Sequence, residues 1–336
     1  MARIVFYCND TRSNIQAFEY YKQDIDALKA LGHDVVVCNR YREIPLRFDA
    51  LFVWWWTYAL VPVLLARLRN KPCMVTGVFN FRFPDGFAKG DYFSRPWWQR
   101  LLIALATRWC ALNLFIDKRE LDACGTYFGL TNARDFPCVL HADYLQGPAQ
   151  RRELTLFNLA WSGKQNLIRK GIPELLGAIA ILKKEGFSVN VKLAGLEGDG
   201  AQFLRDLIAS HGIQNEVECL GPVSRARKIE LLRSCEIYVQ PSRYEGFGLA
   251  TAEAMGSGAC IITCDVGAVR SVVGDCGVYV TPGVPDELAS AIKQVVEDSR
   301  MRADLQSSAY RRACSEFNSD SKRRRLKDCL LEVGVE

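Results

Sequence analysis

Two glutamates set among glycines are the residues whose types and spacing best fit a chemical role. In the stretch SRYEGFGLATAEAMGSG, Glu245 and Glu253 stand eight positions apart, and Gly246 and Gly248 follow the first of them. A carboxylate such as that of Glu253 can accept two hydrogen bonds from a vicinal diol, for example that of a ribose. Glu245 suits sugar hydroxyls or a developing positive charge. The pattern therefore predicts a site for a nucleotide diphosphate that carries a sugar.

An anion site is expected between the two glutamates. The strand-like run EIYVQP ends at Pro241, and the run LATAEAMGSG has the composition of a helix. The first N–H groups of a helix have no partner within it and lie at the positive end of its dipole, which suits a diphosphate. The groups expected there belong to Phe247, Gly248 and Leu249. The alternative is that both glutamates only complement the start of a helix and that the glycines make a tight turn.

Alternating strands and helices must position these residues. Short apolar runs such as RIVFY, DVVVC and DALFV alternate with helix-length amphipathic segments, including one over 15–32 that closes at Gly32. The alternation restarts after about residue 150, beyond the linker-like stretch HADYLQGPAQRRE. This pattern predicts an α/β fold of two doubly wound domains, residues 1–148 and 149–300, in which ligands bind at the carboxyl ends of parallel strands. Residues 301–336 are expected to form C-terminal helices, the last of which crosses back to the first domain.

Composition limits the classes of protein that the chain can belong to. Of its 336 residues 49% are apolar and 24% are charged, which is typical of a soluble globular protein. The thirteen cysteines contain no C-x-x-C pair, so neither a zinc site nor a disulfide framework is indicated, and a reducing cytosol is expected. The start MARIVFYCND is not secretory, and Pro62 interrupts the longest uncharged run, 50–66. We therefore expect a cytoplasmic protein without a membrane-spanning helix.

The motif and its surroundings resemble the signature of the retaining GT-B-fold glycosyltransferases of family 4. Every fixed position of the signature P-S-x-x-E-G-F-G-L-x-x-x-E-A-M-x-x-G is matched between Pro241 and Gly258. The resemblance covers roughly residues 154–300, including VECLGPVSRARKIELLRSCEIYV upstream, where Pro222 and Val223 fall on the donor side. It implies a GT-B fold of two Rossmann-like domains that face a central cleft. It also implies that Glu253 recognises the ribose and that Glu245 contacts the donor sugar.

A basic stretch, WSGKQNLIRKG, corresponds to the family's contacts with the donor diphosphate. The resemblance implies this role for Lys164 and Lys170, although the first position is usually arginine, and Arg169 remains an alternative to the lysines. Positive charge is needed there because negative charge accumulates on the departing phosphate. The alternative is a solvated basic turn. Gly195 begins the family's loop beside the donor, AGLEGDG, whose G-x-x-G-x-G spacing disfavours a dinucleotide-binding oxidoreductase.

The first half departs from the family's pattern. The glycine-rich loop after the first strand is replaced by CNDTRSN, the usual histidine by Asn80, and the acidic residue after DVGAV by Arg270. Residues that follow strands are the acceptor-side candidates, namely Asn9, Asp10, Arg12 and Asn80. Each also fits a plain loop cap or turn residue. A retaining transfer does not need the missing histidine when the leaving phosphate takes the acceptor's proton, so the reaction class stands.

Aromatic residues are concentrated in the first half. Six of the seven tryptophans lie in residues 1–150, which carry 18 Lys/Arg against 14 Asp/Glu. The segment YFSRPWWQRLLIALATRWCALNLF (92–115) has tryptophans and leucines at helical spacing with arginines at its borders, which fits either a membrane-interface helix or a helix packed on the sheet. The run VWWW (53–56) fits either the core or a surface that stacks on a sugar ring.

Together these features predict a metal-independent, retaining glycosyltransferase without a cofactor. Its donor is expected to be a nucleotide-diphosphate sugar, UDP- or GDP-linked. Its acceptor is expected to be a cell-surface glycan or glycolipid intermediate of the lipopolysaccharide, O-antigen or capsule type. Peripheral contact with the inner face of the membrane is possible, and no nucleic acid is expected. The alternatives are a UDP-sugar epimerase of the same fold and a scaffold that binds nucleotide sugar without catalysis.

Overall fold

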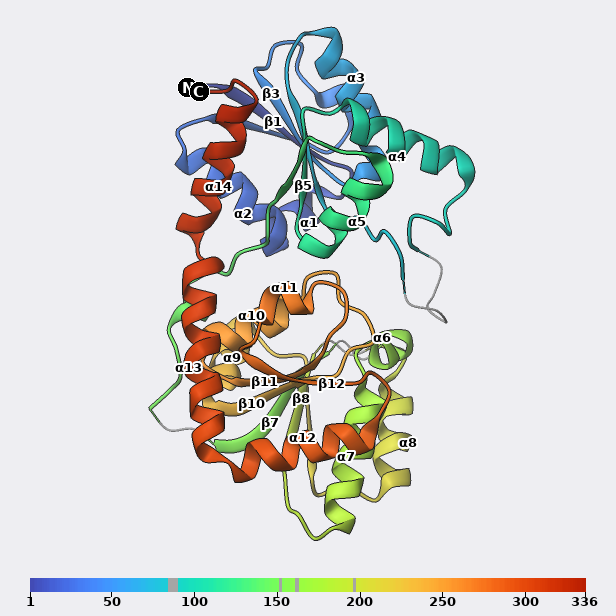
Figure 1. The fold of residues 1–336 in the computed structure, drawn as a ribbon, viewed down its shortest axis with the longest axis vertical. Helices are drawn as coiled ribbons and strands as arrows, with labels where there is room; N and C mark the ends of the chain where they lie inside the picture. The colour runs from blue at the N-terminus through green and yellow to red at the C-terminus, as the bar shows by residue number, and fades with distance from the viewer. Residues whose placement is uncertain (84–89, 151–152, 161–162, 196–197) are drawn as a thin grey trace. The chain divides into compact units, whose positions relative to one another are not determined.

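The chain folds as two units of parallel β-sheet covered by helices. The computed structural model describes residues 1–83, 90–150, 153–160, 163–195 and 198–336. Unit 1 comprises Met1–Val139 and Phe317–Glu336, and unit 2 comprises Leu140–Glu316 (Figure 1). Each unit contains a six-stranded sheet whose neighbouring strands pair in parallel. The predicted α/β class with two doubly wound sheets is confirmed.

The sheet of unit 1 has the strand order β2-β1-β3-β4-β5-β6. Its strands are β1 (Arg3–Cys8), β2 (Asp34–Cys38), β3 (Ala50–Trp54), β4 (Cys73–Gly77), β5 (Leu112–Phe115) and β6 (Ala133–Asp135). Alternate residues of β1 pack into two different cores: Ile4 and Phe6 belong to one, and Val5 and Tyr7 to the other. Because side chains alternate across a strand, this pattern shows that both faces of the sheet are buried.

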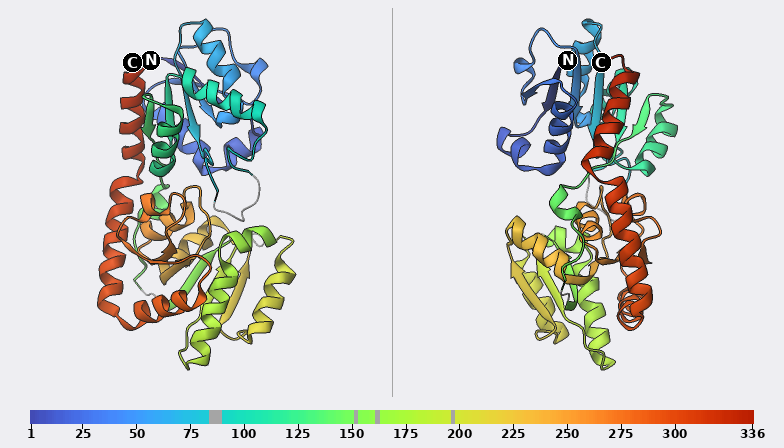
Figure 2. Two further views of the ribbon diagram at one scale, coloured as in Figure 1. Left: turned by 45° about the vertical axis from the view of Figure 1, so that its right-hand side comes forward. Right: turned by 90° about the vertical axis from the view of Figure 1, so that its left-hand side faces the viewer.

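Helices cover both faces of this sheet. They are α1 (Arg12–Ala17), α2 (Glu19–Ala30), α3 (Leu60–Leu68), α4 (Trp97–Trp109), α5 (Lys118–Phe128) and α14 (Ser319–Glu332). Leu28 of α2 and Leu326 of α14 share one core, whereas Ala106 of α4 and Cys124 of α5 belong to the other. The last helix therefore belongs to unit 1, and the two chain ends lie side by side there (Figures 1 and 2).

The sheet of unit 2 has the strand order β12-β11-β10-β7-β8-β9. Its strands are β7 (Glu153–Leu159), β8 (Val191–Ala194), β9 (Val217–Gly221), β10 (Cys235–Gln240), β11 (Cys260–Cys264) and β12 (Gly277–Val280). Its helices are α6 (Lys164–Arg169), α7 (Ile172–Lys184), α8 (Ala201–His211), α9 (Arg225–Ser234), α10 (Leu249–Gly256), α11 (Val269–Val273), α12 (Pro285–Glu297) and α13 (Ser299–Glu316). A core of aliphatic side chains joins α7, α8 and α12 to β7, β10 and β11.

One predicted helix is broken. The segment expected as a single helix over 15–32 forms α1 and α2, with Phe18 extended between them at φ −84° and ψ 122°. The N–H of Phe18 donates to the carbonyl of Asn14 and ends α1, while the ring of Phe18 stacks on Tyr20 with centroids 5.3 Å apart. Capping and aromatic packing therefore override the helical periodicity at this point.

Within the described ranges, no helix is long and apolar enough to cross a membrane. The segment 50–66 is divided between β3, a short 3₁₀ turn at Trp56–Tyr58 and α3, in which Pro62 lies in the first turn. Proline is tolerated there because the first N–H groups of a helix have no partner within it.

Candidate functional site

Glu245 lies in the turn between β10 and α10, at the carboxyl end of the sheet of unit 2. Its side chain is only 5% exposed. The ammonium Nζ of Lys170 lies 2.5 Å from Glu245 Oε1, and the guanidinium Nη1 of Arg169 lies 3.6 Å from Oε2. The hydroxyl of Ser242 donates to Oε1 at 2.8 Å. A buried carboxylate thus faces two cations across the gap between two loops that are 75 residues apart in the sequence.

These cations determine the charge of Glu245. Burial alone would raise the pKa of the Glu245 carboxyl, but the charges of Lys170 and Arg169 and the hydrogen bonds of Lys170 and Ser242 outweigh it and hold the pKa below its usual value. Two further buried hydrogen bonds hold Ser242 in place. Gln240 Nε2 donates to Ser242 Oγ at 3.0 Å, and the hydroxyl of Tyr238 donates to Gln240 Oε1 at 2.6 Å. Glu245 is therefore an ionised group fixed in one orientation.

Backbone contacts fasten the two loops together. The N–H of Arg243 donates to the carbonyl of Arg169 at 2.8 Å, and Arg169 Nη1 donates to the carbonyl of Tyr244 at 2.9 Å. Gly171 has φ +70°, and a Cβ added there would lie 1.9 Å from the carbonyl oxygen of Pro241. A Cβ on Gly267, whose φ is +50°, would lie equally close to the carbonyl oxygen of Glu245. Only glycine fits at either position, because any side chain would push the loop of Glu245 away.

Helix α10 begins directly after this turn. Gly248 is its N-cap, with φ +89°, and Leu249 is its first residue. Phe247 is buried, and Gly246 and Leu249 are half-buried. The structure therefore places the predicted residues Gly246, Phe247, Gly248 and Leu249 where the first N–H groups of the helix lie, beside Glu245 and the two cations. That arrangement can hold an anion at the start of the helix.

Glu253 lies inside α10 and is 9% exposed. Both of its carboxylate oxygens accept from the ammonium of Lys228 on α9, at 2.8 and 3.0 Å. The same ammonium lies 4.7 Å from the ring centre of Tyr144. Burial lowers the pKa of Lys228, but the neighbouring Glu253 carboxylate outweighs it and raises the pKa above its usual value. Glu253 is therefore held in an ion pair with Lys228.

The other predicted donor-side residues lie around the same sheet end. Lys164 is exposed, its N–H donates to Asp199 Oδ1 at 2.9 Å, and its ammonium lies 5.3 Å from the ring centre of Phe203. Pro222 and Val223 form the turn between β9 and α9. Of the motif WSGKQNLIRKG, Trp161 and Ser162 lie outside the described residues, as do Leu196 and Glu197 of AGLEGDG.

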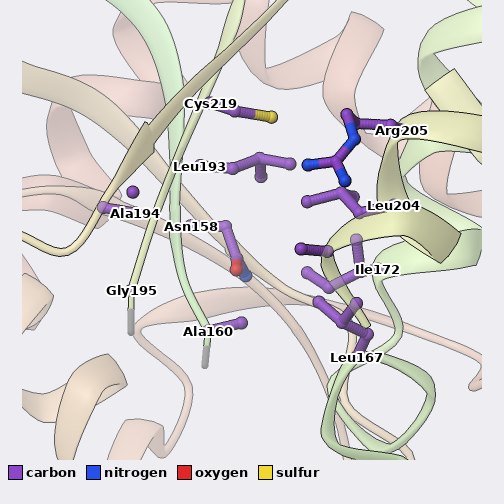
Figure 3. Close-up of a pocket in the computed structure, with 12 residues that line it drawn as sticks. Asn158, Ala160, Leu167, Ile172, Leu193, Ala194, Gly195, Leu204, Arg205 and Cys219 are labelled. Carbon is purple, nitrogen blue, oxygen red and sulfur yellow. The ribbon is translucent and has the colours of Figure 1, made fainter. Parts of the chain in front are cut away.

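A cavity of about 160 Å³ opens beside Gly195. Figure 3 shows that Asn158, Leu193 and Cys219, from the strands, point towards Ile172, Leu204 and Arg205, from the helices. Asn158 Nδ2 donates to the carbonyl of Val239 at 2.6 Å, whereas Oδ1 has no partner among the described residues. The cavity is mostly apolar, with these few polar groups at its wall.

Two of the four predicted acceptor-side residues lie together in unit 1. Asn9 and Asn80 line a cavity of about 290 Å³ at the carboxyl ends of β1, β3 and β4. Asp10 instead accepts from Asn14 Nδ2 and from the hydroxyl of Tyr21. Arg12 is exposed and lies 3.3 Å from Glu43. Asp10 and Arg12 therefore make contacts typical of a loop cap and a surface ion pair.

The run VWWW is largely part of the core, and stacking of its rings on a sugar stays a prediction. Trp54 is buried and its Nε1 donates to Asp24 at 2.8 Å, so it belongs to the core. Trp55 and Trp56 line the cavity of unit 1. Trp56 Nε1 donates to Asn113 Oδ1 at 2.8 Å, which fixes its ring at the cavity wall.

Several residues at these sites are not among the predicted site residues. Lys228 and Tyr144 meet Glu253, Glu120 accepts from the N–H groups of Phe79 and Phe81, and Arg95 lines the cavity of unit 1. Arg270, which replaces the acidic residue of the family pattern, pairs with Asp265 and stacks on Tyr279. Among the described side chains, no group of three or more His, Cys, Asp or Glu residues is arranged to hold a metal ion.

Comparison with known proteins places this geometry in context. Residues 162–312 match the family model of the glycosyl transferases group 1. The chain is 35% identical over 155 residues to an MMP α-(1→4)-mannosyltransferase of Mycolicibacterium hassiacum, which covers 45% of this chain and 37% of the relative. It is 31% identical over 155 residues to the O-antigen chain mannosyltransferase B of Escherichia coli, which covers 44% of this chain and 41% of the relative. The matches thus span less than half of the length of these relatives.

Solved structures resemble the whole chain. The structure of HepE from Anabaena in complex with UDP has a TM-score of 0.78 and 18% sequence identity, and the match covers 98% of this chain and 99% of that one. Such a likeness establishes the fold, so the expected GT-B pair of Rossmann-like domains is confirmed. The residues from 162 to 312, which include Glu245 and Glu253, carry the sequence pattern of the glycosyl transferases group 1.

Proposed function

We propose that the chain is a retaining glycosyltransferase that moves a sugar from a nucleotide-diphosphate donor to a glycan or glycolipid acceptor. The observation that carries the proposal is the buried Glu245 carboxylate, which faces Lys170 and Arg169 at the start of α10. This group of residues lies inside the segment that matches the glycosyl transferases group 1. The UDP held by HepE, a protein of the same fold, supports a nucleotide-sugar donor.

The chemistry follows from where the charges lie. When the bond between sugar and diphosphate breaks, negative charge grows on the departing phosphate, and groups already in place stabilise it at little reorganisation cost. Lys170 and Arg169, together with the first N–H groups of α10, would hold the diphosphate. Lys164 would add a third cation from the start of α6. With these cations the transfer needs no bound metal and no cofactor.

The two glutamates would hold the parts of the donor on either side of the diphosphate. Glu245, kept ionised by its cations, would accept hydrogen bonds from the sugar and favour positive charge that develops on its ring. Glu253 would accept from the ribose hydroxyls, which requires Lys228 to yield one of its two contacts. Gly195, Pro222 and Val223, at the same sheet end, would border the nucleoside.

Retention of configuration is the outcome implied by the family that the chain resembles, and it does not require a protein base to activate the acceptor. The acceptor hydroxyl would attack on the face that the diphosphate leaves, and the departing phosphate oxygen would take the proton. Positioning and charge stabilisation then supply the rate enhancement. Asn9 and Asn80, in the cavity of unit 1, would orient the acceptor.

A cell-surface glycan or a lipid-linked intermediate is the acceptor class that we propose. The similarity to an O-antigen chain mannosyltransferase supports it. So does the outer face of α4, where Trp97 is 71% and Trp98 is 48% exposed, with Leu101 and Leu102 beside them. Exposed tryptophans with arginines along a helix are typical of a membrane interface, so we propose peripheral contact with the cytoplasmic face of a membrane.

The proposal is tested by pairing turnover with donor binding. UDP, GDP and their common sugar derivatives would first be screened for a rise in melting temperature, because a ligand that binds only the folded protein raises it. With the donor so found, Glu245→Gln should lower transfer by about 100-fold or more and leave donor-induced stabilisation largely intact. Glu253→Gln should weaken donor binding itself.

The matched control is Glu230→Gln, on the exposed surface of α9 in the same unit. Full transfer by Glu245→Gln, or loss in Glu230→Gln, would contradict the site assignment. Donor conversion to a second sugar nucleotide without an acceptor would instead identify an epimerase. Binding of donor without turnover on any acceptor would indicate a non-catalytic scaffold.

A further inference from the structure

The cavity of unit 1 contains a charged side chain that the proposed function does not use. Arg95 precedes α4 and lines the cavity together with Trp55, Trp56 and Asn80. Its guanidinium Nη1 donates to Thr57 Oγ1 at 3.1 Å, and its Nε is buried without a hydrogen-bond partner among the described residues. A permanent cation therefore stands at the wall of an aromatic, polar cavity of about 290 Å³.

Among the described residues, no carboxylate pairs with this cation. In the part of the chain that the structure describes, no carboxylate lies within ion-pair distance of Arg95. Asp91, which acts on it electrostatically, accepts instead from the N–H groups of Phe83 and Ser94. Burial lowers the pKa of the Arg95 guanidinium, as expected for a charge short of a counter-ion. A buried charge is costly unless it is paired, and the adjoining cavity is where a ligand can pair with it.

We propose that this cavity is an acceptor subsite that recognises a phosphate ester on the acceptor, with Arg95 as the group that binds the phosphate. Arginine suits this role because its planar fork of donors matches phosphate oxygens. The half-buried indole of Trp55 at the cavity wall provides an apolar surface on which a sugar ring packs. The inference rests on the proposed function, which it sharpens by naming the chemical class of the acceptor.

The position of Arg95 in the chain favours a phosphate that joins a sugar to an apolar group. Arg95 faces the cavity, whereas Trp97 and Trp98, two and three residues later, are exposed on α4. Ile103, on the opposite side of the same helix, also lines the cavity. One helix thus separates a cation-bearing cavity from an exposed apolar face, an arrangement that fits a sugar phosphate whose ester partner lies at an interface.

The test measures binding with the donor site filled. Full-length protein saturated with UDP would be titrated with glucose 1-phosphate, mannose 1-phosphate, their neutral methyl glycosides and a farnesyl-diphosphate-linked sugar, by calorimetry and tryptophan fluorescence. Phosphorylated probes should bind at least about tenfold more tightly than the neutral glycosides, which corresponds to about 1.4 kcal/mol. A further gain for the farnesyl probe would identify a lipid-linked source, and equal affinity would identify a free sugar phosphate.

Substitutions then assign the preference to one side chain. Arg95→Gln should abolish the preference, and Arg95→Lys should retain part of it because the charge remains without the fork. Arg108→Gln, on the exposed side of α4, is the matched control and should bind as the wild type does. Arg95→Lys keeps the test decisive if Arg95→Gln unfolds, as judged from its melting temperature. The inference is overturned if the wild type shows no preference, if it binds no phosphorylated probe at millimolar concentration, or if Arg95→Gln retains the preference.

Failure of this inference can be told apart from failure of the proposed function. Glu245→Gln should lose transfer and still show binding that depends on Arg95, because the two residues belong to different units. Phosphate recognition by a wild type that transfers no sugar would refute only the proposed function. Transfer to neutral acceptors at a rate that Arg95→Gln leaves unchanged would refute only the phosphate subsite.

Discussion

At the scale of single residues, Glu120 shows how one half-buried carboxylate shapes a loop to which it does not belong. Its Oε2 accepts from the N–H of Phe79 at 2.9 Å and its Oε1 from the N–H of Phe81 at 3.0 Å. Between these two lies Asn80, whose φ of +55° is uncommon for a residue other than glycine. Glu120 therefore holds a strained turn at the wall of the cavity in unit 1.

This arrangement makes the stability of unit 1 depend on pH. Burial raises the pKa of Glu120 to about 7, although the N–H groups of Phe81, Phe79 and Asn80 act in the opposite direction. Because this value lies above that of an unfolded glutamate, the contribution of Glu120 to stability is fully present below about pH 4.5 and is lost as the pH rises through about 7. In the wild type, the free energy of unfolding should therefore fall with rising pH across this window by up to about 1.4 kcal/mol per pH unit, and Glu120→Gln should abolish this dependence.

Urea denaturation at a series of pH values between 5 and 8 (roughly the titration window) would measure the effect. Tryptophan fluorescence reports on unit 1, which holds six of the seven tryptophans. Asp122→Asn, exposed on the same helix, serves as the control and should keep the slope of the wild type. Parallel profiles for Glu120→Gln and the wild type would refute the assignment.

At the scale of elements, α4 packs on the sheet, as one of its two expected roles requires, while its contact with a membrane stays a prediction. Ile103, Ala106 and Thr107 are buried against the sheet, while Trp97 and Trp98 point away from the core. The helix is thus both packed on the sheet and exposed along an aromatic stripe. Replacing Trp97 and Trp98 together with glutamine should weaken binding to vesicles that contain phosphatidylglycerol by at least about tenfold, because each indole buries a large apolar area.

Vesicle flotation would measure this binding. Vesicles of phosphatidylcholine alone carry no net negative charge, so weaker binding to them would show how much the arginines contribute. The matched control is Leu331→Gln, a substitution of an exposed apolar residue on α14. Equal flotation of the double variant and the wild type would show that this face does not contact lipid. The melting temperature of the double variant should change little, since the side chains removed are already in water.

Local elements are the part of the site that can be predicted from the sequence. The donor-side motif is readable because its signals are local: a strand, a glycine turn and a helix start fall between Pro241 and Gly258. The contacts of Lys228 with Glu253 and of Glu120 with Phe79 join residues 25 and 41 positions apart. Such pairs depend on which helices pack side by side, and no spacing in the sequence encodes that. The break at Phe18 is a different case, because local capping and the stack of Phe18 on Tyr20 override the helical periodicity there.

At the scale of the whole molecule, a buried ion pair joins the end of the chain to its beginning. The Lys322 ammonium on α14 lies 2.8 Å from Asp24 Oδ1 on α2, and Trp54 Nε1 donates to the other carboxylate oxygen. Both charged side chains are buried, and Lys322 also donates to the carbonyl of Pro137 at 3.1 Å. The last helix is thus part of the core of unit 1.

Breaking this pair should be costly. Lys322→Met leaves the Asp24 charge buried without its partner, so we expect a loss of about 3–5 kcal/mol in the free energy of unfolding of unit 1. The double variant Asp24→Asn with Lys322→Met should recover part of the loss. Chemical denaturation followed by tryptophan fluorescence would measure both, with Lys327→Met on the exposed side of α14 as the control. A loss below about 1 kcal/mol would mean that the pair contributes little.

The close backbone packing at Gly171 and Gly267 affects which substitutions the protein can accept around Glu245. Main-chain atoms, rather than the side chains that would touch a ligand, set the spacing between the loop of Arg169 and the turn of Glu245. Exposed residues around this frame can therefore be replaced while the frame keeps its shape. If the proposed donor site is correct, a few such replacements would suffice to change which nucleotide or sugar it accepts.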